Sequence, residues 1–404
     1  MKILYINHFP LIGSGSGVYT NTIAKSFAKK GNSSIVIYPD NNDKTNEEEN
    51  ITYYPVLFKS HKLPFDFPCF TTHPLSTFAF TSMTDEEKKL YEDVFRDKIE
   101  EVIIKEKPDI IHGNHIWTLS GIGAELAKKY HIPLVLTCHG TCILGVLEEE
   151  KLKHNWGTKW AHIAADYSDR IITISNDNKQ NVERIFPNNK DKTVLIKNGI
   201  NTDVFKHDKA IDKEQVLKDF NIPGNYDKIV TFAGKLTYIK GVDTLLDAAT
   251  IYEDDNTLTI IAGDGEAKED LIDLAKKNNL KNVFFIVNRS QEELNKLFNI
   301  ATCSVVSSRK DAFGLVAAEA MASGAPVIVT NHGGLKDLVN DEVGFLFEIG
   351  DHNTLAKDIL KILNKEVIFD KNKISQYAIS NFSQDKMVKE VEKIYEEAIK
   401  NRLN

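Results

Sequence analysis

Three features are scarce in this sequence of 404 residues, and each scarcity argues against a class of protein. The four cysteines include no Cys-x-x-Cys pair, which argues against a zinc site or a disulfide framework and predicts reduced thiols. No stretch approaches the roughly 20 uncharged apolar residues that a membrane span requires. Positive charge is not in excess, because 50 Lys and Arg face 58 Asp and Glu for a net charge of −8; this argues against nucleic acid as a partner.

The first residues, MKILYIN, form a strand pattern and lack the charged, apolar and small-residue order of a secretory signal. We therefore expect a cytoplasmic protein. The composition leaves open only peripheral contact with the inner face of a membrane. At roughly 100–200 residues per domain, the length predicts two or three hydrophobic cores.

Short apolar runs alternate with helix-forming stretches in both halves of the chain, which is typical of parallel β-α-β units. The runs expected as strands are KILYI, SSIVIYP, DIIH and PLVLTCH in the first half, and KIVTFAG, LTIIAGDG, VFFIV, CSVVSS, PVIVT and GFLFE in the second. We predict an α/β protein of two Rossmann-like, doubly wound parallel-sheet domains that face a central cleft.

The polar stretch after Asn201 places the predicted boundary, so the first domain spans residues 1–203 and the second spans residues 204–384. The final segment, about residues 385–404, has an apolar stripe at helical spacing. The helix that it predicts could pack back on the first domain. Residues 51–83 are rich in Phe, Pro and Thr, and we expect a loop excursion there.

A glycine-rich turn, Gly13 to Gly17, leads from the first expected strand directly into a helix. Backbone N–H groups at such a turn can approach an anion at the positive helix end, and Ser16 and Gly17 are the candidate contacts. A plain tight turn is the alternative. An NAD fingerprint would need glycine or alanine where Val18 stands, although Asp40 resembles a ribose acceptor.

Two lysines follow the first expected strand of the second half. Lys235 comes after Gly234, and Lys240 follows five residues later, so both cations could project from one strand-to-helix loop and grip a diphosphate. Each charge-assisted contact is worth about 1.5–3 kcal/mol. The alternative is that both are ordinary surface lysines.

Two carboxylates mark the densest group of candidates, which runs from residue 307 to residue 328. Asp311 precedes a helix-forming stretch, and Glu319 lies within it among apolar residues, where an unpaired carboxylate costs free energy. If one helix spanned both, the carboxylates would lie about 12 Å apart and turned by about 80°, too far for the pair of a hydrolase. The alternative makes Asp311 a helix N-cap and Glu319 a solvated residue.

One motif in this region matches a known pattern. It is Asp311-Ala312-Phe313-Gly314-Leu315-Val316, followed by Glu319-Ala320-Met321-Ala322, Gly324-Ala325-Pro326-Val327 and Gly333-Gly334. With it, the chain resembles the family 4 retaining glycosyltransferases of the GT-B fold, over essentially its whole length. Further matching motifs are Gly15-Ser16-Gly17, Cys138-His139-Gly140-Thr141, Asn198-Gly199-Ile200, Gly234-Lys235, Lys240-Gly241 and Gly263-Asp264-Gly265.

The resemblance implies a hexosyltransferase. It would move a hexose or N-acetylhexosamine from a nucleotide diphosphate sugar to a hydroxyl-bearing acceptor, which could be a saccharide, a lipid-linked sugar or a small molecule. UDP-sugars are favoured as donors, with GDP-mannose second. Residues 1–203 would then form the acceptor side, and residues 204–384 would bind the nucleotide sugar.

The same resemblance assigns roles by position. Glu319 would accept hydrogen bonds from the ribose hydroxyls, and Lys235 and Lys240 would hold the diphosphate. The other implied donor contacts are Gly234, Gly314, Leu315 and Val316 near the phosphates, Asp311 beside the hexose, and His139 against the hexose from the first domain. Two positions depart from the pattern: Asp311 stands where glutamate is usual, and Lys235 stands where arginine is usual, which keeps the charge but loses the bidentate fork.

The resemblance also implies a mechanism. Because the sequence has no Asp-x-Asp metal motif, we expect no metal or other cofactor, and the lysines and helix-end N–H groups would stabilise the leaving diphosphate. No nucleophile is evident, which favours front-face attack with retained stereochemistry. The alternatives are a nucleotide-sugar epimerase or hydrolase of the same fold and an NAD-dependent oxidoreductase.

Two further groups have more than one interpretation. His139 lies between Cys138 and Cys142, and metal binding there is the less favoured alternative because a plausible fourth ligand is missing. The phenylalanines of the expected loop excursion are interpreted as half core and half acceptor wall, with a membrane-facing patch as the alternative; they are Phe65, Phe67, Phe70, Phe78 and Phe80.

Overall fold

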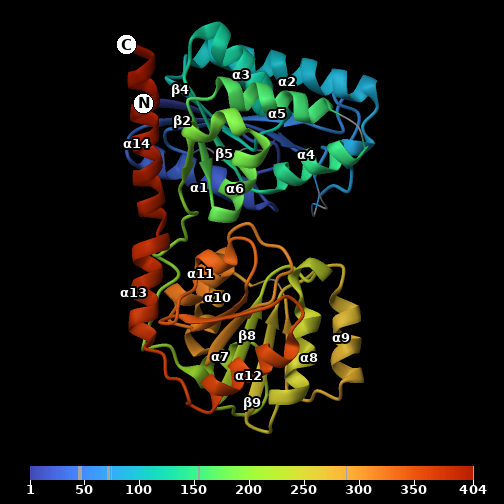
Figure 1. Cartoon of the computed structure of the whole chain (residues 1–404), viewed down its shortest axis with the longest axis vertical. Helices are drawn as coiled ribbons and strands as arrows, with labels where there is room; N and C mark the ends of the chain where they lie inside the picture. Colours follow the sequence, from blue (N-terminus) through green and yellow to red (C-terminus); the bar gives the residue numbers. More distant parts are fainter. Residues whose placement is uncertain (44–47, 71–72, 74, 153–154, 288, 404) are drawn as a thin grey trace. The chain divides into compact units, whose positions relative to one another are not determined.

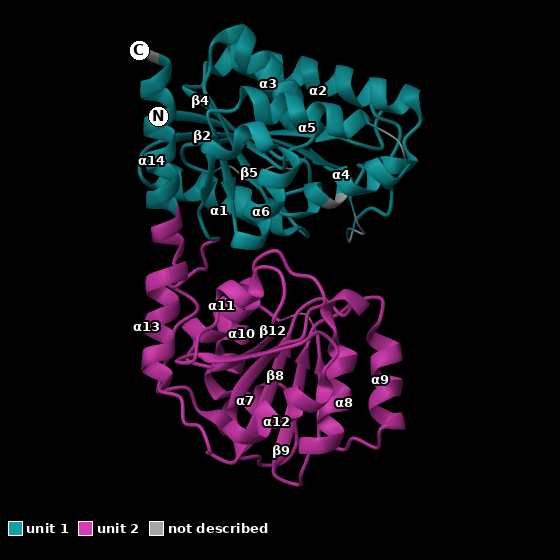
Figure 2. Ribbon diagram, viewed as in Figure 1, with its two compact units in different colours: residues 1–197, 388–404 teal, residues 198–387 magenta. Residues whose placement is uncertain are grey.

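The computed structural model describes residues 1–43, 48–70, 73, 75–152, 155–287 and 289–403. The chain divides into two compact units, which are unit 1 (residues 1–197 and 388–404) and unit 2 (residues 198–387) (Figure 2). Each unit is an open parallel sheet with helices packed on it (Figure 1). This architecture confirms the predicted α/β class with two Rossmann-like sheets.

Unit 1 contains a seven-stranded sheet in the order β3-β2-β1-β4-β5-β6-β7, with every neighbouring pair parallel. The inner strands β4 and β5 are buried along their whole length, because helices cover both faces of such a sheet. The strands are β1 (Lys2–Ile6), β2 (Ser33–Asp40), β3 (Ile51–Leu57), β4 (Ile110–Asn114), β5 (Leu134–Cys138), β6 (Arg170–Thr173) and β7 (Thr193–Leu195).

The first two helices of unit 1 begin at polar caps. The Ser14 side chain accepts a hydrogen bond at the start of α1, and Thr84 and Glu87 form a complete capping box at the start of α2. The helices are α1 (Gly15–Lys29), α2 (Asp85–Glu106), α3 (Thr118–Tyr130), α4 (Thr141–Leu152), α5 (Trp156–Tyr167) and α6 (Asn176–Ile185), with the short turns η1 (Phe80–Ser82) and η2 (Pro187–Lys192).

The expectation of a loop excursion over residues 51–83 is wrong at its beginning, because residues 51–57 form strand β3. This strand carries Pro55, which lacks an N–H group for a sheet hydrogen bond, and β3 lies at the edge of the sheet where that loss is tolerated. Beyond β3, Phe67 and Phe80 are buried, and three further phenylalanines, Phe65, Phe70 and Phe78, pack half-buried against the core. The cluster is therefore at least partly core.

Unit 2 contains a six-stranded parallel sheet in the order β10-β9-β8-β11-β12-β13. Its strands are β8 (Lys228–Ala233), β9 (Thr257–Ala262), β10 (Val283–Ile286), β11 (Cys303–Val306), β12 (Val327–Thr330) and β13 (Gly344–Phe347). All six coincide with runs expected from the sequence. Its helices and turns are α7 (Lys213–Asp219), η3 (Tyr238–Lys240), α8 (Val242–Tyr252), α9 (Lys268–Lys277), α10 (Gln291–Ile300), α11 (Leu315–Ala322), η4 (Leu335–Asp337), α12 (His352–Leu363) and α13 (Lys371–Phe382).

The closing helix α14 (Gln384–Leu403) begins in unit 2 and ends in unit 1. Its apolar stripe is buried, with Val391 and Tyr395 fully enclosed. The Tyr395 ring packs against Phe27 of α1 at 5.1 Å between centroids. Near the C-terminal end, Arg402 forms a two-nitrogen contact with the Asp169 carboxylate.

Two buried histidines connect strands of unit 1 to its helices. The Leu119 N–H at the start of α3 donates to His8 Nε2 at 2.9 Å, and His8 Nδ1 lies 2.7 Å from the Asn114 carbonyl oxygen at the end of β4. His112 of β4 contacts the Tyr395 hydroxyl through Nδ1 and the Thr137 hydroxyl through Nε2. Burial lowers the pKa of both imidazoles from 6.5 to about 3.

Within the described residues, none of the helices combines the length and the apolar character that crossing a membrane demands.

These two histidines predict a specific acid sensitivity. Because both stay neutral in the folded state and take up a proton once unfolded, stability is lost as the pH falls from about 6.5 towards 3. At pH 5 the loss is about 2 kcal/mol for each histidine. We expect urea unfolding followed by circular dichroism to show this fall between pH 7 and pH 5.

The control compares how steeply the free energy of unfolding changes with pH in each variant, and not the free energy of unfolding itself. His8→Gln should reduce the slope, whereas His131→Asn, at an exposed helix end, should leave it unchanged. Equal slopes in the parent and His8→Gln would contradict the explanation.

Candidate functional site

The predicted phosphate-binding lysines lie in the loop between β8 and α8. Lys240 Nζ is 2.7 Å from Asp311 Oδ2, so the structure brings together two residues that are far apart in the sequence. The contact arises because β8 and β11 are neighbours in the sheet, and the loops after parallel strands emerge at the same edge. Lys235 instead pairs with Glu266 at 3.8 Å.

The turn η3, which ends at Lys240, packs closely against the loop that follows β11. Gly241 has φ +66°, and a Cβ atom at this position would lie 2.0 Å from the Ser307 carbonyl oxygen. Only glycine fits this close approach without strain. The Ser307 hydroxyl donates to the Lys240 carbonyl oxygen at 3.2 Å, so the two loops are held together on both sides of Gly241.

Arg309 is the residue of this site that sequence analysis missed. Its guanidinium donates to both carboxylate oxygens of Asp243, at 2.8 and 2.5 Å, and to the Tyr238 carbonyl oxygen at 2.7 Å. The same group stacks over the Tyr238 ring at 4.0 Å. Arg309 therefore fastens the η3 turn that carries Lys240. Only its position next to Lys310 and Asp311 in the motif could have suggested it.

Asp311 lies in the loop before α11, as the sequence indicated, because the helix begins only at Leu315. The separation calculated for one helix that spans Asp311 and Glu319 therefore does not apply. In the loop, Asp311 Oδ1 accepts from the Phe313 N–H at 3.3 Å and the Asp311 carbonyl oxygen accepts from Gly334 N–H at 3.0 Å. The alternative interpretation of Asp311 as the N-cap of α11 is wrong. The N-cap is Gly314, which has φ +97° and no side chain to satisfy the first amides of the helix.

Leu315 and Val316 are half-buried at this uncapped start of α11. The first N–H groups of a helix have no partner within it and carry partial positive charge. The N-terminus of α11 can therefore accept an anionic group. This is the place that the resemblance assigned to a phosphate.

Glu319 lies on the same helix, one turn beyond Leu315, or about 6 Å along the axis. It is half-buried beside buried alanines, and its carboxylate makes no hydrogen bond or ion pair with any part of the chain that the structure describes. Burial raises the pKa of Glu319 from 4.5 to about 7. A ligand that donates hydrogen bonds to this buried carboxylate would stabilise its ionised form.

The glycine-rich turn in unit 1 caps its own helix. The Gly17 N–H donates to the Ser14 hydroxyl at 3.0 Å, and a Cβ atom on Gly17 would lie 2.2 Å from the Pro10 carbonyl oxygen. Ser16 is buried. The turn therefore uses one of the amides that the anion hypothesis needed, and the donor contacts of Ser16 and Gly17 stay predictions.

His139 lies directly after β5, with its Nε2 2.9 Å from Asn114 Oδ1. Burial lowers the pKa of His139 from 6.5 to about 3, so the ring is neutral at pH 7. An amide oxygen can only accept a hydrogen bond. The ring proton therefore sits on Nε2, and Nδ1 is left as an acceptor for a hydroxyl group.

The neighbourhood of His139 does not resemble a metal centre. In the described ranges, no group of three or more His, Cys, Asp or Glu side chains is placed to hold an ion. Cys138 Sγ and Cys142 Sγ are 3.5 Å apart, both are free thiols, and Cys138 also accepts from Asn178 Nδ2.

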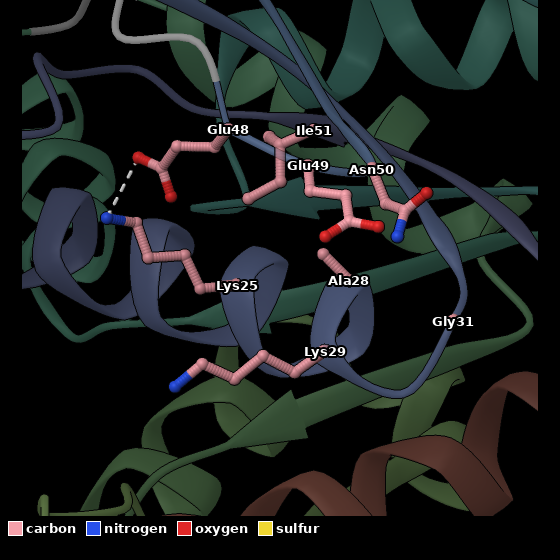
Figure 3. A pocket seen from close by; sticks show the side chains of 8 residues that line it. All are labelled: Lys25, Ala28, Lys29, Gly31, Glu48, Glu49, Asn50 and Ile51. Atoms are coloured by element: carbon pink, nitrogen blue, oxygen red, sulfur yellow. Dashed lines mark ion pairs between the residues drawn. The ribbon is translucent and has the colours of Figure 1, made fainter.

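A separate hollow of about 510 Å³ opens on unit 1 and contains none of the predicted site residues (Figure 3). Its lining residues come from the end of α1 with Gly31, and from residues 48–51 at and just before the start of β3, and the Lys25–Glu48 ion pair of 2.9 Å crosses one side. Since two lysines and two glutamates line it, its lining carries no charge of one sign that would select a ligand.

Comparison with known proteins gives the same assignment for both units. A family model described as Glycosyltransferase Family 4 matches residues 13–204, and one described as Glycosyl transferases group 1 matches residues 212–397. An uncharacterised glycosyltransferase of Methanocaldococcus jannaschii is 31% identical over 298 residues, which cover 73% of this chain and 77% of the relative. The N-acetyl-α-D-glucosaminyl L-malate synthase of Bacillus anthracis is 25% identical and covers 99% of this chain and 98% of its own.

Solved structures agree in fold. Sucrose-phosphate synthase from Thermosynechococcus elongatus superposes with a TM-score of 0.76 at 20% identity, over 98% of this chain and 99% of that one. Anabaena HepE in complex with UDP gives a TM-score of 0.75 at 17% identity, over 98% and 100% of the two chains. The chain belongs to the family 4 glycosyltransferases and is a hexosyltransferase of the GT-B fold.

Proposed function

We propose that this enzyme transfers a hexose or N-acetylhexosamine from a nucleotide diphosphate sugar, with a UDP-sugar favoured, to an acceptor hydroxyl. One observation carries the proposal: α11 presents an uncapped N-terminus and, one turn away, the unpartnered carboxylate of Glu319. A nucleoside diphosphate offers the matching groups in that order, because its phosphates are anionic and its ribose hydroxyls donate hydrogen bonds. Anabaena HepE, which shares the fold, has been solved with UDP and with UDP-glucose.

Charge on the leaving group would be stabilised by the chain itself. As the bond between the anomeric carbon and the diphosphate oxygen breaks, negative charge grows on the phosphates, where Lys240, Lys235 and the α11 amides can meet it. In the proposed front-face route the acceptor oxygen bonds to the same face of the anomeric carbon. Because this is the face that the diphosphate leaves, stereochemistry is retained, and the departing phosphate oxygen takes the acceptor proton. No metal or other cofactor takes part in this proposal.

Lys240→Ala and Glu319→Gln should each lower turnover of a UDP-sugar by about 10²–10³-fold, because the first removes a cation that contacts the phosphates and the second removes the charged acceptor of the ribose hydroxyls. The measurement is UDP release with the fold checked by circular dichroism. Lys276→Ala is the matched control, since Lys276 is an exposed lysine of α9 that pairs only with Asp273 in the described contacts. Near-normal turnover in both site variants would remove the basis of the proposal.

Glu319 also predicts how donor affinity depends on pH. If the ionised carboxylate binds the donor, the dissociation constant of UDP should rise up to tenfold for each unit below about pH 7, where the free carboxyl takes up its proton. In Glu319→Gln this dependence should be lost. Titration calorimetry at pH 5.5, 6.5 and 7.5 measures both.

Arg309 should act as a positioning residue. Arg309→Lys keeps the charge but loses the planar guanidinium that holds the Tyr238 turn. At an assay temperature well below the melting temperature of the variant, we expect about a tenfold loss in kcat/KM and a rise in the KM for the donor. Arg402→Lys is the control, because Arg402 makes the same type of contacts in unit 1, to Asp169 and to the Tyr167 ring and carbonyl oxygen. Equal effects on KM in both variants would show that Arg309 only stabilises the fold.

Metal independence is tested by a thermal-shift panel of UDP-, GDP- and ADP-sugars. A ligand that binds only the folded state raises the melting temperature, and we expect the largest rise with UDP-sugars, unchanged by EDTA. Loss of the shift in EDTA would contradict the metal-free mechanism, and a larger shift with GDP- or ADP-sugars would change the donor.

A further inference from the structure

His115 is held in a backbone conformation that side chains rarely adopt. It follows β4 with φ +70°, its N–H donates to the Thr137 carbonyl oxygen at 2.8 Å, and its own carbonyl oxygen accepts from the Ser120 hydroxyl at 2.5 Å. A histidine in the left-handed region costs stability that the surrounding contacts must offset. Such residues are concentrated at functional sites.

The His115 ring is buried, and its nitrogens make no hydrogen bond within the described structure. It is 1% exposed, and four rings surround it, with centroids 5.0–5.7 Å away: His8, Phe9, Phe70 and His139. Neither ring nitrogen has a hydrogen-bond partner in the described structure. Both nitrogens of His8 and of His112 are used, so His115 differs from the two histidines that hold the fold.

Two asparagines near His115 in the fold also have a buried polar atom without a partner in the described structure. Asn114 Nδ2 and Asn7 Oδ1 are also buried without a partner among the residues described. The pairing of Ile6 with Gly113 places the ends of β1 and β4 side by side, so the residues that follow these positions lie at one edge of the sheet. Buried polar groups normally find partners, and several orphaned ones in one place indicate a missing occupant.

We propose that His115, Asn114 and Asn7 bind hydroxyl groups of the acceptor, and that this part of the acceptor is uncharged. The inference rests on the proposed function and names the substrate class of its second substrate. A hydroxyl group both donates and accepts, and so does a neutral imidazole, while Asn114 Nδ2 donates and Asn7 Oδ1 accepts. The three residues together therefore match neighbouring hydroxyls of a polyol or sugar.

The three residues suit hydroxyl groups better than an anion. Carboxylates and phosphates are recognised through charged side chains or through several convergent N–H donors. Asn7 offers its Oδ1, which only accepts, and Asn114 offers one amide donor, so neither supplies such a site. Burial, together with the nearby His139 and His8 rings, also holds the pKa of His115 well below its usual 6.5 and keeps the ring neutral at pH 7.

The test measures the stability and the transfer activity of the same variant. His115→Phe keeps a ring of similar size and removes both orphaned nitrogens, a gain that opposes the cost of phenylalanine at φ +70°, so we expect the melting temperature to change little. Transfer to a neutral acceptor should fall at least tenfold. The assay measures UDP released from UDP-glucose on addition of D-glucose or myo-inositol, with D-glucose 6-phosphate and L-malate as anionic comparisons.

Tyr91→Phe is the matched control. The Tyr91 hydroxyl is likewise buried without a hydrogen-bond partner in the described chain, but it lies on α2 in the core of unit 1. This variant should leave the transfer rate unchanged. If His115→Phe does not fold, His115→Asn replaces it, because asparagine tolerates the left-handed backbone, and the same tenfold loss is expected.

Two outcomes would overturn the inference. These are unchanged transfer in the His115 variant, and no acceleration of UDP release by either neutral compound, whether or not the anionic compounds accelerate it. Each variant is also tested for its thermal shift with UDP. If the parent protein itself shows no shift with UDP or UDP-glucose, the donor assignment fails, which is a separate result from failure of the acceptor site.

Discussion

Parallel pairing of the strands is the constraint on which the rest of this structure depends. Because neighbouring strands run in the same direction, their carboxyl ends lie at one edge, and loops distant in the sequence meet there. The adjacency of β8 and β11 brings Lys240 to Asp311 and Arg309 to Asp243. In unit 1 the adjacency of β4 and β5 brings Asn114 to His139.

Buried polar groups in this protein serve two purposes, and their hydrogen bonds distinguish them. His8 and His112 use both ring nitrogens and connect strands to helices, so they contribute to the fold. Among the residues that the structure describes, the Glu319 carboxylate and the His115 ring have no hydrogen-bond partner, and an unsatisfied polar group of this kind costs stability. A ligand that satisfies them recovers this free energy as binding energy.

Much of the fold and part of the site could be predicted from the sequence. Every strand of unit 2 was expected, because strands of a parallel sheet form short continuous apolar runs. In unit 1, β3 was missed because Pro55 and its polar neighbours hide an edge strand, and β6 and β7 are short. Asp311 was correctly placed before a helix, but the sequence did not show that Gly314 delays the start of α11 to Leu315.

The sequence by itself determined the α/β class, the family, and the residue types at the candidate site, since these depend on local periodicity and on short motifs. Only the tertiary structure decided which charges are paired and which polar groups are left over. Lys235 and Lys240 look alike in the sequence, yet one meets Glu266 and the other Asp311. The reason is physical: pairing and burial depend on distances between segments far apart in the chain, and those distances are set by sheet order and packing.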